Sequence, residues 1–252
     1  MSTLEFVSTS AGGIAESDAP LVSAPALVAA LGTQPALTVP LVSGREPGTG
    51  LIWARLDETA RFFGVDIPPV TALHDTVTGF LQEATARHGQ VTLAARVMVV
   101  EVGGQSRFVV SASVIDPFRP EPVVLGVTPS HREAGPLPHW RQMAARTGSQ
   151  AEADLAEREL RAAGCVDEVV TDGELVHRPR LGALVFDTAG GAVGTGADRL
   201  ELLRAAGLHD GVRYSDAPVA ASGAARAHWV SPRFETHPVS AIGARRFEVA
   251  PI

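Results

Sequence analysis

The side chain best suited to acid–base chemistry in this sequence is His177, because an imidazole titrates near neutral pH without special tuning. Two arginines, Arg178 and Arg180, follow it within three residues. A guanidinium binds carboxylate or phosphate through paired hydrogen bonds, so this segment could hold an anion beside a proton-transfer group. His139 and Tyr214 are weaker candidates. The alternative for His177 is a solvated histidine near the end of an exposed strand.

The chain contains no lysine, since all 21 side chains counted as Lys or Arg are arginines. A guanidinium stays protonated in proteins and is a poor nucleophile, so covalent chemistry through a lysine imine is excluded. A P-loop, which ends in Gly-Lys, is excluded for the same reason, although four glycines gather between Gly190 and Gly196. No G-x-S-x-G nucleophile elbow occurs either.

The cysteine and histidine patterns do not indicate a metal site. Cys165 is the only cysteine, which favours a small packed thiol and leaves no intramolecular disulfide. The eight histidines show no pair at the spacing of zinc proteases. We therefore expect neither a metal nor another cofactor.

Composition excludes several classes of partner. The net charge is −7 and the basic residues form no cluster, which argues against a nucleic-acid surface. A hydrophobic content of 45% in 252 residues is enough for a well-buried core. The first seven residues carry no positive charge before an apolar run, and the apolar stretch 20–30 is too short for a bilayer span. We expect a cytoplasmic protein without membrane contact.

The first half of the chain has the pattern of a small α/β lobe. Apolar residues at helical spacing predict a helix over 51–64, ended by Gly64, and a second helix over 70–88. Valine-rich segments 90–102 and 107–115, separated by two glycines, predict paired strands.

The second half mixes short strands with helices and has no regular βαβ alternation, which favours an α+β fold. Residues 128–149 have the composition of a linker, and Ser149 with Glu152 forms a capping-box pattern at the start of a helix that ends at Gly164. We predict an N-terminal lobe over 1–127, a linker over 128–148 and a larger C-terminal lobe over 149–252. Further strands are expected at 166–170, 175–177 and 183–187, and a further helix at 198–206.

The segment ADLAERELRAAGCVDEVVTDGELVHRPRLGALVF, residues 153–186, resembles the class IV aminotransferases that depend on pyridoxal phosphate, including branched-chain and D-amino-acid aminotransferases and 4-amino-4-deoxychorismate lyase. The family pattern is a helix ending in Gly, an acidic pair at a strand start, a D-G turn, then V-x-E and S-N-L-F. Residues 52–56 (IWARL), followed by FFGVDIPP, resemble its H-L-x-R-L helix. Residues 95–99 and 237–239 resemble its R-L-x-V and late P-V strands. The resemblance implies a two-lobed class IV fold.

The departures from the family pattern fall on its cofactor contacts. The Schiff-base lysine corresponds to Arg146 or, with a small shift, to Arg141 or Trp140, and none of these forms an imine. The glutamate that stabilises the protonated pyridine nitrogen corresponds to Arg178 or, one residue away, His177. A fixed cation there would repel the pyridinium.

The phosphate-binding G-I-T-R turn corresponds to residues 194–199, where Asp198 opposes an anion at the helix start. Three independent elements have therefore changed together, and this pattern indicates that the cofactor has been abandoned.

These observations give the hypothesis of an enzyme that works without pyridoxal phosphate, by a lyase, isomerase or cyclase step on a small anionic metabolite, in specialised (natural-product) biosynthesis. Proton transfer with arginine stabilisation of an oxyanion needs no electron sink. The resemblance also implies a homodimer. The alternatives are a non-catalytic binding or scaffolding protein and, last, a protein that keeps the cofactor non-covalently. The predicted catalytic residues are His177, Arg178 and Arg146, and the predicted substrate-binding residues are Arg141, Arg180, Arg96 and Tyr214.

Overall fold

The computed structural model describes residues 5–9, 14–17, 32–102, 104–129, 138–149, 151–209, 211–215 and 217–249. The chain divides into two compact units, each built from two stretches of sequence. Unit 1 comprises residues 1–115 and 138–150, and unit 2 comprises residues 116–137 and 151–252.

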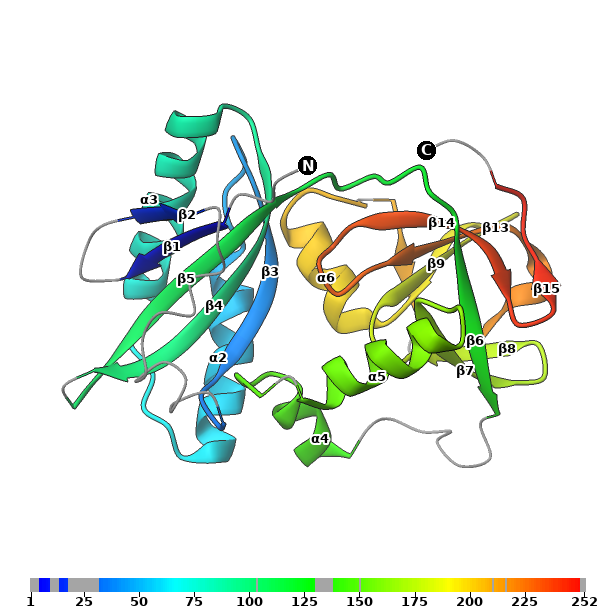
Figure 1. Cartoon of the computed structure of the whole chain (residues 1–252), viewed down its shortest axis with the longest axis horizontal. Helices are drawn as coiled ribbons and strands as arrows, with labels where there is room; N and C mark the ends of the chain where they lie inside the picture. The colour runs from blue at the N-terminus through cyan, green and yellow to red at the C-terminus, as the bar shows by residue number, and fades with distance from the viewer. Residues whose placement is uncertain are drawn as a thin grey trace. The chain divides into compact units, whose positions relative to one another are not determined.

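Unit 1 is a five-stranded antiparallel sheet accompanied by helices α2 and α3 (Figure 1). The strand order is β2-β1-β5-β4-β3. The strands are β1 (Glu5–Thr9), β2 (Ile14–Ser17), β3 (Ala36–Val42), β4 (Thr92–Val102) and β5 (Gln105–Ile115). The predicted hairpin is confirmed, because β4 pairs with β5 from Thr92↔Ile115 to Val102↔Gln105.

The two long helices of unit 1 follow their apolar stripes. Helix α2 (Thr49–Phe63) buries Ile52, Leu56 and Ala60. It ends where Gly64 takes a φ of 67°, a left-handed conformation in which its amide bonds back to the last turn. Helix α3 (Val70–His88) matches the predicted range. Both helices pack on each other and on the sheet.

Residues 138–149 belong to unit 1, whereas their composition predicts a linker. They form a short helix, α4 (His139–Ala144), which contacts α2. The segment after it is tied to β3, because the amide of Ala36 donates to the carbonyl of Arg146. The chain thus enters unit 2 with β6 and then returns to unit 1 at residues 138–150. This division differs from the predicted 1–127, 128–148 and 149–252. The capping box falls partly outside the described residues, because position 150 is not described.

Unit 2 is a ten-stranded mixed sheet whose interior face carries the core. The order is β11-β10-β9-β13-β14-β6-β7-β8-β12, with β15 paired to β14. The strands are β6 (Val123–Pro129), β7 (Asp167–Asp172), β8 (Leu175–Pro179), β9 (Ala183–Thr188), β10 (Gly191–Thr195), β11 (Arg213–Tyr214), β12 (Val219–Ala220), β13 (Ala224–Val230), β14 (Thr236–Ile242) and β15 (Arg245–Arg246).

The sheet of unit 2 curls on itself. Strand β8 contacts β9 and β10, although neither is its neighbour in the hydrogen-bonded order. The enclosed core includes Val169, Val176, Leu184, Phe186 and Trp229. Helix α5 (Ala151–Ala162) packs on β7, and helix α6 (Ala197–Ala205) packs on β9 and β10 (Figure 1). A short 3-10 helix, η2 (Ala221–Gly223), precedes β13.

A buried carboxylate joins three parts of unit 2. Asp167, at the start of β7, is fully buried and accepts hydrogen bonds from the amides of residues 168, 180, 181 and 182 at 2.7–3.2 Å. The indole of Trp229 on β13 also donates to it, at 2.8 Å. Burial raises the pKa of Asp167, and the hydrogen bond from Trp229 and those from the backbone oppose that effect.

Gly182 is required where the loop wraps the carboxylate. A Cβ at this position would lie 2.3 Å from the carbonyl oxygen of Val230 and 2.4 Å from the indole nitrogen of Trp229. No larger residue therefore fits without moving the ring that bonds Asp167.

Trp229→Phe is predicted to destabilise the fold, because Asp167 loses its only side-chain donor among the described residues while staying buried. A lost hydrogen bond to a charged group costs about 1.5–3 kcal/mol. Urea unfolding followed by far-UV circular dichroism measures the loss. The control Trp140→Phe, at an indole that is 59% exposed, is expected to change stability by less than about 0.5 kcal/mol. Equal effects of the two substitutions would contradict the role of Asp167.

A histidine beyond α6 predicts acid sensitivity. His209 has a φ of 56° and its Nε2 lies 2.9 Å from the hydroxyl of Thr236. Burial, and secondarily the charge of His228, lowers the pKa of His209 below 6.5. The unfolded chain therefore binds more protons below pH 6.5, so the free energy of unfolding falls as pH drops from 6.5 through the folded-state pKa.

His209→Asn tests this, because asparagine tolerates a positive φ but does not titrate. The slope of unfolding free energy against pH between 5 and 7 should become shallower, by up to about 1.4 kcal/mol per pH unit. An unchanged slope would rule out His209 as the source.

Candidate functional site

The geometry around His177 is set by an irregularity in β8. Val170 pairs with Arg178, but the next residue of β7, Thr171, pairs with Val176. His177 therefore has no directly opposite residue, and β8 contains a bulge of one residue at this position.

The bulge takes His177 and Arg178 out of regular alternation. Val176, the residue before them, lies in the enclosed core. Directly paired residues share a face, so Arg178 lies on the side of Val170, which is opposite to the core residue Val169. In a regular strand two consecutive residues would point to opposite faces, and the bulge removes that restriction.

Both side chains are half-buried rather than solvated. The Nε2 atom of His177 is buried and has no hydrogen-bond partner among the described residues. A buried polar atom without a partner costs free energy, so the site favours a ligand or water that supplies one.

The start of α6 lies next to the bulge. The hydroxyl of Thr195, the last residue of β10, donates to the carbonyl of His177 at 2.6 Å. Gly196, the N-cap of α6, has a φ of 94°, and a Cβ there would lie 2.9 Å from the Cβ of Ala183. Asp198 occupies the first turn of the helix.

A buried arginine supports this helix start. Arg199 donates to the carbonyls of Pro232 (2.9 Å) and Leu181 (3.1 Å), and its guanidinium stacks over the ring of Phe234. Burial lowers the pKa of Arg199 to about 10, against the opposite influence of Asp167 and Asp198, so it stays charged near neutral pH. Its role is to hold α6 against the loop after β8.

Two other predicted substrate-binding residues lie in unit 2. Arg180 is exposed at the end of β8 and forms an ion pair of 3.6 Å with Glu168. The hydroxyl of Tyr214 donates to the carbonyl of Leu200 at 2.7 Å, and its ring lies under the guanidinium of Arg204. Arg180 is therefore accessible beside the bulge, whereas the hydroxyl of Tyr214 is engaged by α6.

The other predicted residues lie in unit 1. Arg146 is buried and its Nη1 bonds the carboxylate of Glu58 at 2.6 Å. Arg96 donates to the carbonyl of Thr147 at 2.8 Å. Arg141 lies in α4 and is half-buried. The structure thus places His177 and Arg178 on β8 and Arg180 directly after that strand, and holds Arg146 and Arg96 in contacts internal to unit 1.

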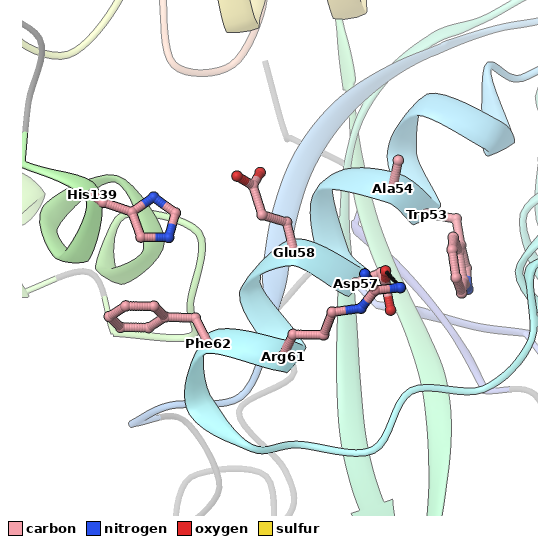
Figure 2. Close-up of a pocket in the computed structure, with 7 residues that line it drawn as sticks. All are labelled: Trp53, Ala54, Asp57, Glu58, Arg61, Phe62 and His139. Carbon is pink, nitrogen blue, oxygen red and sulfur yellow. Dashed lines mark ion pairs between the residues drawn. The ribbon is translucent and has the colours of Figure 1, made fainter.

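A shallow groove of about 440 Å³ lies on α2 beside α4 (Figure 2). Its acidic side chains are already paired, Asp57 with Arg61 and Glu58 with Arg146, each at 2.6 Å. His139, a weaker sequence candidate, packs edge-on against Phe62. The residues that line the groove are Trp53, Ala54, Asp57, Glu58, Arg61, Phe62 and His139. We assign no chemistry to this groove.

Solved structures identify the fold. A hypothetical aminotransferase from Mycobacterium tuberculosis, in its PLP-bound form, matches with a TM-score of 0.69 and 19% identity over 98% of this chain and 94% of that chain. A fold IV transaminase from Curtobacterium pusillum matches with a TM-score of 0.64 and 15% identity over 99% and 94%. The chain has the class IV aminotransferase fold.

A branched-chain aminotransferase from Thermoproteus uzoniensis also shares the class IV fold, with a TM-score of 0.63 and 17% identity over 98% of this chain and 90% of that chain. No protein-family model and no curated protein sequence matches the chain. The predicted class IV aminotransferase-like α+β fold is confirmed, and at these identities the likeness concerns the fold alone.

The residues of this chain do not fit lysine-bound pyridoxal phosphate. No residue can form the imine, because the sequence has no lysine. Arg178, at the position that resembles the family glutamate, is half-buried at the bulge and would repel a protonated pyridine nitrogen. Asp198 places a negative charge in the turn of α6 that would meet the phosphate.

Two absences concern only the residues that the structure describes. They contain no group of three or more His, Cys, Asp or Glu side chains that could hold a metal ion. None of their helices is long and apolar enough to cross a bilayer.

Sequence reasoning missed Thr195 and Asp167 as parts of this site. Thr195 lies in the glycine-rich stretch that fails to match any nucleotide loop, so its hydroxyl has no sequence signal. Asp167 had one, because it is the first of the two acidic residues at a strand start. Only the register shows that the loop after β8 folds back onto it.

Substituting Arg146 by Met is predicted to cost about 1–3 kcal/mol of stability, because a buried charged hydrogen bond to Glu58 is lost. Arg61→Met is the matched control, since its pair with Asp57 has the same 2.6 Å distance but the arginine is 76% exposed. That pair is worth at most about 0.5–1 kcal/mol. Thermal and urea unfolding of both variants measure the difference. Indistinguishable losses would mean that Arg146 does not anchor its segment.

Proposed function

We propose that this protein is an enzyme with the class IV aminotransferase fold that transfers a proton on a small anionic metabolite without pyridoxal phosphate. The observation that carries the proposal is the β8 bulge, where an imidazole and a guanidinium adjoin and both are half-buried. Lyase, isomerase or cyclase steps fit this pair, and a biosynthetic route to a natural product is the setting we favour.

The chemistry follows from the two side chains. Arg178 binds a carboxylate or the carbonyl oxygen of the substrate. Neutral His177 takes the proton from the carbon next to that carbonyl, and the electron pair of the broken C–H bond moves to the carbonyl oxygen as an enolate. The guanidinium stabilises this oxyanion, and the imidazolium returns the proton at the same or another atom. Atoms and electrons balance without a co-reactant.

Arg180 is the second anion-binding residue in this proposal, because it is exposed directly after the strand that carries His177 and Arg178. The contacts predicted for Arg146, Arg141, Arg96 and Tyr214 stay predictions, and the proton transfer does not require them. We also propose a homodimer in the cytoplasm, with no nucleic-acid or membrane partner.

The second candidate is a non-catalytic binding or scaffolding protein with the same fold. It is favoured by the departures at the three elements that resemble the family's lysine, glutamate and phosphate-binding turn, since loss of these contacts needs no new chemistry. The half-buried pair at the bulge favours catalysis instead, because an imidazole can transfer a proton while an adjacent guanidinium binds an anion.

Exchange of carbon-bound protons with solvent tests the proposal even before the substrate is known. The protein is incubated in D2O with a panel of small 2-oxo and 3-oxo carboxylic acids, and NMR follows the loss of the signals of protons on the carbon next to the keto group. We expect exchange with at least one acid, reduced by about 100-fold or more in His177→Gln. Arg178→Gln is expected to raise the concentration needed for half-maximal exchange.

The matched control is His88→Gln, which removes a histidine in α3 of unit 1. It should leave exchange unchanged. Exchange in no mixture, or equal exchange in wild type and His177→Gln, would favour the scaffold. Titration with pyridoxal phosphate should give no protein-bound absorbance between about 330 and 430 nm, whereas a stable bound chromophore would support non-covalent use of the cofactor.

A further inference from the structure

We propose that Thr195 is a positioning residue that fixes the β8 bulge and so aims His177 at the substrate. This inference rests on the function proposed above for His177 and Arg178. Thr195 does not belong to the reacting groups, because its hydroxyl bonds the backbone of His177 and not its imidazole.

The bulge leaves a backbone group that needs a partner. A bulged residue is skipped by the ladder, and the pairs on either side of His177 are Val170↔Arg178 and Thr171↔Val176. On the other edge of β8, strand β12 pairs only with Leu175 and Val176. Buried carbonyls are almost always hydrogen-bonded, so the His177 carbonyl requires a donor from elsewhere. The Thr195 hydroxyl supplies it.

The hydrogen bond between Thr195 and the His177 carbonyl is short and excluded from solvent. Thr195 is 1% exposed and its Oγ1 lies 2.6 Å from the carbonyl oxygen. Water therefore cannot replace the hydroxyl without entering a closed space, and a branched side chain has few alternative rotamers. The contact holds the carbonyl in one place.

Thr195 is itself held on both sides. A Cβ at Gly194 would lie 2.2 Å from Leu200, and one at Gly196 would lie 2.9 Å from Ala183. The backbone of residues 194–196 is therefore packed too closely against α6 and β9 to move freely. Thr195 also pairs with Leu184 in β9. The Thr195 hydroxyl thus fixes the position of β8 relative to the start of α6.

The consequence is a link between α6 and the imidazole. If the Thr195 hydroxyl is removed, the carbonyl of His177 loses its donor, and the backbone of the bulged residue can rotate between the two registered pairs that flank it. The imidazole of His177 would then change its direction relative to Arg178. A misplacement of about 1 Å at a reacting group can cost about 100-fold in rate.

The test compares Thr195→Val, which keeps the shape and removes the donor, with Thr195→Ser, which restores it. Thr188→Val is the matched control, because Thr188 makes the same kind of bond, to the carbonyl of Gly191 at 2.7 Å, elsewhere on the outer strands. The first readout is the pair of imidazole 15N signals of His177, assigned with His177→Gln. The second is the proton exchange rate described above.

We expect Thr195→Val to shift the His177 signals and to slow exchange about ten-fold or more, with Thr195→Ser within about three-fold of wild type and Thr188→Val unchanged. Unmoved His177 signals in folded Thr195→Val would overturn the inference. Should that variant fail to fold, Thr195→Ala, which also removes the donor, is measured in its place and the same outcome decides. Shifted signals in a protein that shows no exchange at all would retain the positioning role and refute the proposed function.

Discussion

The buried carboxylate of Asp167 is the constraint on which the rest of unit 2 depends. It sits at the first residue of β7, yet four amides of the chain and an indole from β13 donate to it. An ionised or neutral carboxyl at zero exposure is tolerated only because these donors replace water. The carboxyl therefore fixes the position of residues 180–182 after β8. The end of β8 must lie where these residues can reach the carboxyl.

The bulge is the local result of that constraint. Strand β8 starts from a tight turn with β7, in register at Asp172↔Leu175, and must end where residues 180–182 cover Asp167. One extra residue is accommodated between these two fixed points, and it is His177. The candidate site is thus produced by closure of a hydrogen-bonded loop, with Thr195 and the start of α6 completing the closure from the other side.

The sequence predicted the elements better than it predicted their connections. Helices α2 and α3 and the β4–β5 hairpin follow from apolar spacing and glycines, since each depends on contacts within a short stretch. The return of residues 138–149 to unit 1 depends on long-range bonds from Ala36 and Arg96 that leave no local pattern. Proline and glycine content therefore indicated a linker where a helix forms.

For the site, residue chemistry pointed to His177 and Arg178, but period-two alternation would have separated them. A shift of register between two strands is a property of the pair of strands, so the sequence of β8 alone could not show it. The same limit applies to Arg146, whose partner Glu58 lies 88 positions earlier.

The discontinuity of both units has a consequence for expression and folding. Because each is composed of two stretches that interleave along the chain, no single cut separates one unit from the other. When residues 1–115 have been synthesised, α4, which packs on α2, is still missing. Strand β6 is synthesised before α4, and its sheet neighbours β7 and β14 follow only later. Truncated versions of either half should consequently be aggregation-prone, whereas a circular permutant that opens the chain at another exposed turn keeps all segments together.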